Sequence, residues 1–102
     1  MSHTHSFSEK DWPFKCSSGQ TTFTTRLVAK ENYPIVFIVH DEDDDWQFLC
    51  GTTNEVDDIV TACFGCIYDR HPFIKQFSDL PKGWVAWRED KDSPWHREPY
   101  EE

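Results

Sequence analysis

Carboxylates are the most concentrated chemically active groups in this sequence. Residues 41–58 hold eight of them and no lysine or arginine. They are Asp41, Glu42, Asp43, Asp44, Asp45, Glu55, Asp57 and Asp58. A charge run of this kind is often only a solvated loop, but it also speeds encounter with a basic partner and repels acidic ones. Calcium fits poorly, because neither Asp41 nor Asp43 as a loop start places the Gly and Glu that an EF-hand requires.

A second candidate is the pair Cys63 and Cys66, whose C-x-x-C spacing brings two sulfurs to one side of a turn. The same spacing serves zinc binding and dithiol chemistry. Zinc would need two further ligands, for which Cys16, Cys50 and His71 are the candidates, and the sequence has no second closely spaced pair. We therefore expect inert thiols and no cofactor, and keep a zinc or thiol protein centred on Cys63 and Cys66 as an alternative.

His40 beside Asp41 has the residue types of a general base, but the sequence offers no recognisable nucleophile motif and no glycine-rich phosphate loop. We expect a strand-end histidine satisfied by local hydrogen bonds, in a protein that is not an enzyme. Several tryptophans could line a small-ligand groove, which gives a further alternative, although the core is their more common place. They are Trp46, Trp84, Trp87 and Trp95.

The elements that position these residues are short. An unbroken apolar run, Ile35 to Val39, is typical of a strand buried on both faces. The run Trp46 to Leu49 follows the acidic residues, which predicts a hairpin with Asp41 to Asp45 at its tip. Trp84 to Trp87 reads as a third strand, entered through a Pro-Lys-Gly turn.

Two segments carry conflicting signals. Residues 21–30 are rich in threonine, which favours a strand, yet they end in a Leu-Val-Ala-Lys run that suits a short helix. Residues 52–70 have helical spacing, but Gly65 and the β-branched residues before it argue against one long helix. We predict a strand over Ile59 to Cys63, followed by a short helix up to Arg70.

These elements predict a single α+β domain with a mostly antiparallel sheet covered on one face by short helices. The expected division is a flexible segment at 1–11, the domain at 12–88 and a charged tail at 89–102. Within the domain, Pro72 permits a second short helix that ends before Pro81. The predicted core consists of Ile35, Phe37, Val39, Phe48, Ile59, Ile67, Phe73, Phe77 and Val85.

Charge and composition exclude several classes of protein. The chain has 102 residues, with 10 Lys and Arg against 19 Asp and Glu, a formal charge of −9 and 37% hydrophobic residues. A negative surface argues against nucleic-acid binding, and the apolar content is enough for a core. The most hydrophobic segment, Tyr33 to His40, is too short to span a membrane. Because residues 1–14 lack a secretory signal pattern, we expect a cytoplasmic protein with reduced thiols.

Three motifs taken together resemble a bacterial protein family. They are His40-Asp41-Glu42-Asp43, the Asp-Trp-Gln-Phe-Leu-Cys-Gly run at 45–51, and the Asp-Leu-Pro-Lys-Gly-Trp-Val-Ala-Trp-Arg run at 79–88. The likeness spans roughly Cys16 to Trp95. The family, long catalogued as a domain of unknown function, is grouped with the immunity proteins of polymorphic toxin systems. This sequence departs from it at His71, where the family usually has an acidic residue before the proline.

This resemblance implies a role in neutralising a toxin. With the acidic cluster, it predicts a non-catalytic immunity-type protein that docks on a basic cognate toxin such as a nuclease. Trp46 would be an exposed aromatic anchor ringed by charge. The predicted partner-binding residues are Asp41, Glu42, Asp43, Asp44, Asp45, Trp46, Asp57 and Asp58.

Overall fold

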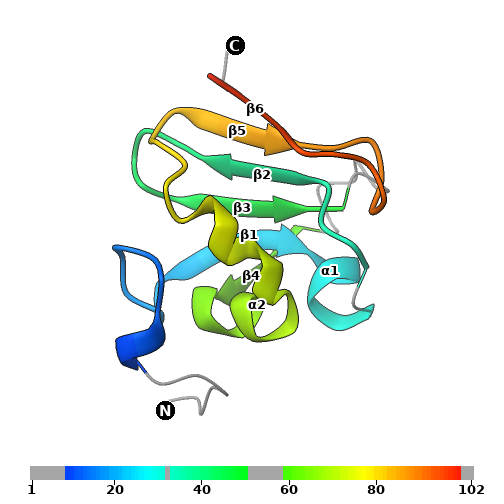
Figure 1. The fold of residues 1–102 in the computed structure, drawn as a ribbon. Coiled ribbons are helices and arrows are strands. Elements are labelled where there is room, and N and C mark those ends of the chain that lie inside the picture. Colours follow the sequence, from blue (N-terminus) through cyan, green and yellow to red (C-terminus); the bar gives the residue numbers. More distant parts are fainter. Residues whose placement is uncertain (1–8, 32, 51–58, 100–102) are drawn as a thin grey trace.

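One mixed sheet forms the frame of the structure, a computed structural model that describes residues 9–31, 33–50 and 59–99 (Figure 1). The sheet has six strands in the order β4-β1-β3-β2-β5-β6. Neighbouring strands are antiparallel except β1 and β3, which run parallel. The strands are β1 (Thr21–Thr25), β2 (Phe37–His40), β3 (Trp46–Leu49), β4 (Ile59–Cys63), β5 (Trp84–Trp87) and β6 (His96–Pro99).

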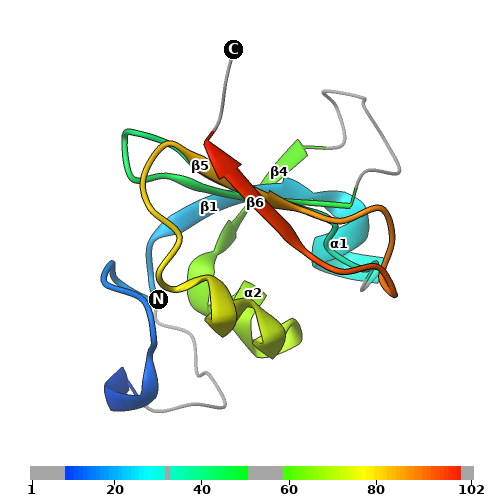
Figure 2. The same ribbon diagram turned by 45° about the horizontal axis from the view of Figure 1, so that its top comes forward.

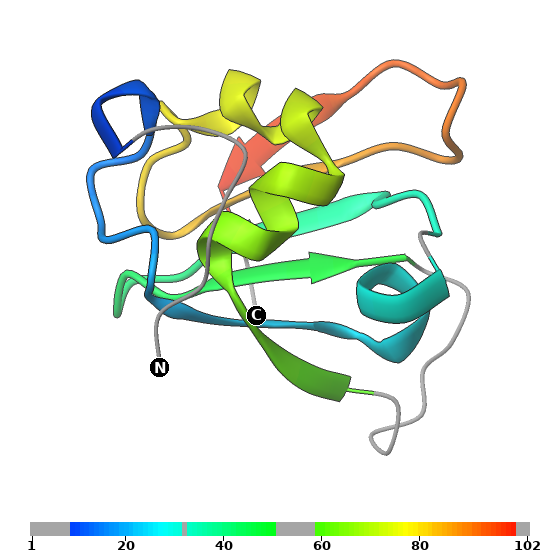
Figure 3. The ribbon, with the colours of Figure 1, turned by 90° about the horizontal axis from the view of Figure 1, so that it is seen from below.

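The helices are short, and α1, α2 and η3 lie on the same face of the sheet (Figures 2 and 3). The helical elements are the 3-10 helix η1 (Glu9–Asp11), α1 (Arg26–Glu31), α2 (Phe64–Arg70) and the 3-10 helix η3 (Pro72–Phe77). Val28, Ile67 and Ile74 from these helices join Ile38 and Phe48 of the sheet in one buried cluster. The predicted α+β domain is confirmed. Among the described residues, no helix is long and apolar enough to cross a membrane.

The first conflict in the sequence is resolved by a strand followed directly by a helix. Thr22 and Thr24 of β1 are buried, and their hydroxyls donate to backbone carbonyls of β4 and β3 at 2.9 and 2.6 Å. The Thr25 hydroxyl accepts a hydrogen bond from the Val28 amide at 3.2 Å, which satisfies an otherwise free N–H in the first turn of α1. Threonine therefore suits both elements.

The predicted strand Ile59–Cys63 and the helix after it are also confirmed. All residues of β4 pair with β1, and the first three, Ile59, Val60 and Thr61, have the β-branched side chains that favour strands. In the first turn of α2, the Gly65 amide donates to the Ser18 carbonyl at 2.7 Å. The helical and extended signals in this segment therefore belonged to two adjacent elements.

Most of the predicted core is buried, but the prediction that Ile59 belongs to it is wrong. It is 42% exposed, because β4 is an edge strand and Ile59 lies on the face of the sheet away from the helices. Phe37 and Phe73 are only partly buried. Apolar periodicity identifies a strand but not which of its faces a second layer covers. The buried members are Ile35, Val39, Phe48, Ile67, Phe77 and Val85.

The segment 89–102, predicted to be a charged tail outside the domain, contributes a strand. His96–Pro99 form β6 and pair with β5. All four residues are exposed, so no apolar pattern signals the strand. Besides backbone pairing, Arg97 holds it: the guanidinium donates to Asp79 at 2.8 Å and lies 4.9 Å from the centre of the Phe77 ring.

The N-terminal boundary differs in a smaller way. Within the segment 1–11, which we expected to be flexible, Glu9–Asp11 form η1. The Trp12 ring beside it packs against the edge of Phe64 at a centroid distance of 5.0 Å. Residues 1–8 and 100–102 lie outside the described residues.

Candidate partner-binding site

The acidic run forms the turn of the β2–β3 hairpin, as predicted, and its backbone is tightly fixed. The Asp41 amide donates to the Asp45 carbonyl and the Asp44 amide to the Asp41 carbonyl, both at 3.0 Å. The Asp41 carboxylate accepts from the amides of Asp43 and Asp45 at 2.9 and 3.0 Å. Asp44 adopts a φ of 69°, a conformation that Asp tolerates better than most residues. The turn is therefore ordered by its own carboxylates.

His40 anchors this turn to the rest of the domain. Its Nε2 lies 2.6 Å from Oδ1 of Asp44 and its Nδ1 lies 2.7 Å from the Leu80 carbonyl. Each ring nitrogen therefore lies within hydrogen-bond distance of an oxygen atom. The ring also stacks on Trp46, with centroids 4.0 Å apart and planes 13° apart. The contact with Asp44 is local, as expected, whereas Leu80 is forty residues away in the sequence. Because both nitrogens are engaged, neither is free to take a proton from a nucleophile.

The prediction that Trp46 is an exposed anchor is wrong. Its exposed fraction is 3%, and its ring packs against Phe14 and Phe64 at centroid distances of 5.2 and 5.4 Å. Residue 46 pairs with His40 and points to the face that the helices cover. An anchor in this region must therefore come from other residues.

The predicted acidic residues divide into two kinds. The carboxylates of Asp41 and Asp44 are engaged within the turn and with His40. Glu42 and Asp43 are exposed, and Asp45 is partly exposed. The side chains best placed to meet a partner are therefore those of Glu42 and Asp43. Asp57 and Asp58 lie outside the described residues.

Glu42 also packs beside Gly83, at the turn that leads into β5. The Gly83 amide donates to the His40 carbonyl at 2.7 Å, and its φ is +81°, in the left-handed region that favours glycine. A Cβ at this position would lie 3.2 Å from Oε1 and 3.3 Å from Cγ of Glu42. The acidic turn and the Pro81-Lys82-Gly83 turn are therefore positioned together.

This arrangement predicts that Gly83→Ala destabilises the protein by about 1–2 kcal/mol, because alanine would have to adopt a left-handed backbone conformation. Urea unfolding measures the change. Gly19→Ala is the matched control: among the described residues, a Cβ there would meet only Oγ of Ser17, at an ordinary 3.6 Å. Equal urea midpoints for the two variants would contradict the prediction.

The face of the sheet opposite the helices carries several apolar side chains and is hollowed. A groove of about 730 Å³ crosses β2 and β3, and three acidic residues border it. The alternation of side chains along the strands places Phe37, Val39 and Leu49 on this face. The groove is lined by Phe37, Val39, Asp41, Glu42, Asp43, Gln47, Leu49 and Gly83. We call the whole face of the sheet opposite the helices the open face.

A second hollow, of about 500 Å³, lies on the other side of the hairpin. Lys15, Cys16, His40 and Asp44 are among its lining residues. Burial, and secondly the charge of Asp44, raises the pKa of the Cys16 thiol, which disfavours the nucleophilic thiolate. With both His40 nitrogens engaged as well, this cysteine and histidine do not form an activated pair.

No protein-family model, curated protein or solved structure matches the chain. The immunity-family resemblance therefore remains a hypothesis, and the function has to be argued from the geometry of the site.

The cysteine pair sits at the junction of β4 and α2. The Cys63 thiol donates to the Ser18 carbonyl at 3.1 Å. Burial and a hydrogen bond with Cys63 raise the pKa of the Cys66 thiol. Cys50 is buried and accepts from the Thr25 hydroxyl at 3.3 Å. In the part of the chain that the structure describes, no three His, Cys, Asp or Glu residues form a group that could hold a metal ion.

The other tryptophans have separate surroundings. Trp87 stacks on His96 with a centroid distance of 4.5 Å. Trp95 packs edge-on against Phe77 at 4.8 Å. Trp84 packs against the buried core on the side of the sheet that the helices cover. These contacts stabilise β5, β6 and η3.

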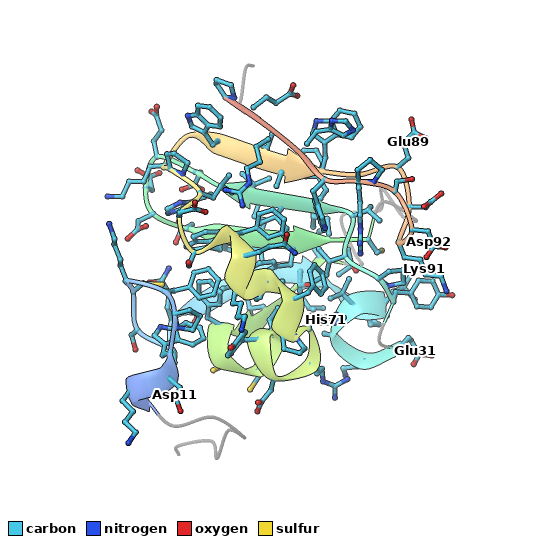
Figure 4. The ribbon with its side chains drawn as sticks, viewed as in Figure 1. Asp11, Glu31, His71, Glu89, Lys91 and Asp92 are labelled. Atoms are coloured by element: carbon cyan, nitrogen blue, oxygen red, sulfur yellow. The ribbon has the colours of Figure 1, made fainter. Side chains whose placement is uncertain are left out.

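His71 is buried where α2 ends and η3 begins (Figure 4), a structural role that we did not predict from the sequence. Its Nε2 has no hydrogen-bond partner among the described residues. Burial lowers the pKa of His71, an effect that outweighs a hydrogen bond with the backbone of Val28. Burial therefore favours the neutral form of this side chain in the folded protein.

This burial predicts that acid weakens the fold. Below the ordinary histidine pKa of about 6.5, the unfolded chain takes up a proton that folded His71 resists, so unfolding is favoured. We expect the free energy of unfolding to fall between about pH 7 and pH 5, and His71→Gln to flatten this slope. His96→Gln, at an exposed histidine, is the control. Parallel slopes for His71→Gln and wild type in urea unfolding would contradict the prediction.

Proposed function

We propose that this protein is a non-catalytic, immunity-type protein that neutralises a basic toxin by binding it through the acidic β2–β3 turn. The observation that carries the proposal is the fixed geometry of this turn. Its backbone is held by the Asp41 carboxylate and by His40, while Glu42 and Asp43 remain exposed. A preorganised loop loses little conformational entropy on binding, so more of its interaction energy appears as affinity.

The charge of the chain supports a basic partner. The formal net charge is −9, and the acidic turn adds local density to that overall field. Such a field raises the encounter rate with a cationic protein and disfavours acidic competitors. Nucleic acid is a poor partner for the same reason.

The surroundings of the nucleophilic and basic groups support a role without catalysis. His40 has both nitrogens engaged, and the pKa of Cys16 is raised. A stoichiometric binder requires neither an activated nucleophile nor a general base.

Association kinetics test the proposal. The probe is the purified product of the neighbouring gene, since immunity genes lie beside those of their toxins. Glu42→Gln with Asp43→Asn should lower the association rate constant roughly 3–10-fold at low salt and flatten its salt dependence. Asp44 is left intact because it holds His40.

The matched control removes the same charge elsewhere. Glu89 and Asp92 are exposed and lie at the opposite end of the sheet from the acidic turn (Figure 4). Glu89→Gln with Asp92→Asn should therefore change the association rate much less. Equal effects of the two double variants, or no complex with the neighbouring protein, would overturn the proposed function.

A further inference from the structure

The open face extends across most of the sheet. Directly paired residues form its centre: Phe37 lies between Leu49 on one side and Trp87 on the other. Side-chain alternation adds members from the outer strands. The apolar residues of this face are Ile59 from β4, Phe23 from β1, Leu49 from β3, Phe37 and Val39 from β2, and Val85 and Trp87 from β5.

None of the described helices lies over this surface, although Val39 and Val85 within it are buried (Figures 2 and 3). Phe23 is 39% exposed and Phe37, Leu49 and Trp87 are partly exposed, whereas α1, α2 and η3 all lie on the other side (Figures 2 and 3). An apolar sheet face is normally covered by a second layer, and contiguous exposed apolar patches mark interaction sites.

The charges at its rim indicate what kind of partner fits. Asp41, Glu42 and Asp43 border the same groove that Phe37 and Leu49 line. A partner that seats apolar side chains on Phe37 and Leu49 therefore brings its flanking residues against these carboxylates, where Lys or Arg is favoured. A second copy of this chain fits badly, because two rims and two net charges of −9 would repel.

We propose that the open face, centred on Phe37 and Leu49, is the docking surface, and that it takes a segment of a basic protein in which apolar side chains alternate with Lys or Arg. The inference rests on the proposed function and supplies the anchor that buried Trp46 does not. Apolar contacts with the open face then set how long the complex lasts, while the acidic turn sets how fast it forms.

The test uses synthetic peptides as probes and amide NMR spectra of the labelled protein as the readout. An eight-residue peptide of alternating Leu and Lys should shift resonances of β1, β2 and β3. A Ser-Lys peptide keeps the charge without the apolar side chains, and a Leu-Glu peptide reverses the charge. Both should bind at least about tenfold more weakly, a difference of about 1.4 kcal/mol.

Variants then locate the surface. Phe23→Thr with Leu49→Thr keeps residues that suit strands and should weaken binding of the Leu-Lys peptide at least about tenfold. Tyr33→Thr is the control, since Tyr33 is 40% exposed but lies outside the open face. The amide spectrum of each variant also reports whether it is folded. Full affinity of the double variant, or shifts confined to other elements, would overturn the docking surface.

The remaining outcomes separate the inference from the proposed function. Equal binding of the Ser-Lys peptide would overturn the apolar anchor and leave the acidic turn as the recognition element. Equal binding of the Leu-Glu peptide would overturn the basic partner. A dimer in sedimentation that Phe23→Thr with Leu49→Thr dissociates would assign the open face to a second copy and overturn the inference.

Discussion

Phe64→Ala is expected to remove a large share of the stability of this protein, about 3–5 kcal/mol. Phe64 is fully buried at the start of α2, where it contacts Phe14, Trp46 and Phe48 at centroid distances of 4.5, 5.4 and 5.4 Å. Truncating a buried phenylalanine costs about 3–5 kcal/mol, because transfer energy is lost and a cavity remains. Domains of this size have total stabilities of only about 5–10 kcal/mol.

Urea unfolding followed by near-UV circular dichroism measures this effect. Phe23→Ala is the matched control, because Phe23 is exposed on the open face and its removal should cost less than about 1 kcal/mol. A urea midpoint for Phe64→Ala close to that of wild type would show that the aromatic cluster is not the centre of the core.

Arg88→Ala should have the next largest effect, about 2–4 kcal/mol. The Arg88 guanidinium donates from Nε and Nη2 to the Ile35 carbonyl at 3.1 and 2.8 Å, and from Nη1 to the Lys91 carbonyl at 3.1 Å. It also lies 4.5 Å from the centroid of the Trp95 ring. Removing it leaves a partly buried carbonyl short of donors and frees the connection between β5 and β6.

Two further variants isolate the cause. Arg88→Lys keeps the charge but cannot reproduce the planar fork of donors, so it should recover only part of the lost stability. Lys91→Ala, at an exposed side chain, should change the free energy of unfolding by less than about 0.5 kcal/mol. Full recovery by Arg88→Lys in urea unfolding would show that charge alone, and not the fork, matters.

The parts of the fold that the sequence predicted correctly have strong local signals. Of the predicted strand Ile35 to Val39, the part from Phe37 lies in β2, which extends to His40. Trp46–Leu49 forms β3 and Trp84–Trp87 forms β5, with the predicted bounds. These strands are neighbours in the sheet, in the order β3-β2-β5, and β2 and β3 form a hairpin. β6 was missed because its stability comes from backbone pairing and from Arg97, neither of which leaves an apolar pattern.

Local sequence patterns were also insufficient to predict the details of the candidate site. The sequence located the acidic turn, but not which carboxylates support its backbone. Asp41 and Asp44 differ from Glu42 and Asp43 only through contacts within the turn and with His40, which itself depends on Leu80, forty residues away. The burial of Trp46 follows from which face of the sheet the helices cover, and that face is a property of tertiary structure.

The position of β1 between β4 and β3 has a consequence for synthesis of the chain. Both neighbours of β1, β3 and β4, come later in the sequence, so during synthesis it emerges without a partner. An unpaired strand rich in valine or isoleucine would be prone to aggregate before β3 and β4 are synthesised. Four of the five residues of β1 are threonines, which form strands readily yet stay hydrated through their hydroxyls. Once β3 and β4 follow, two of these hydroxyls exchange water for strand carbonyls, so one residue type serves both the nascent chain and the finished core.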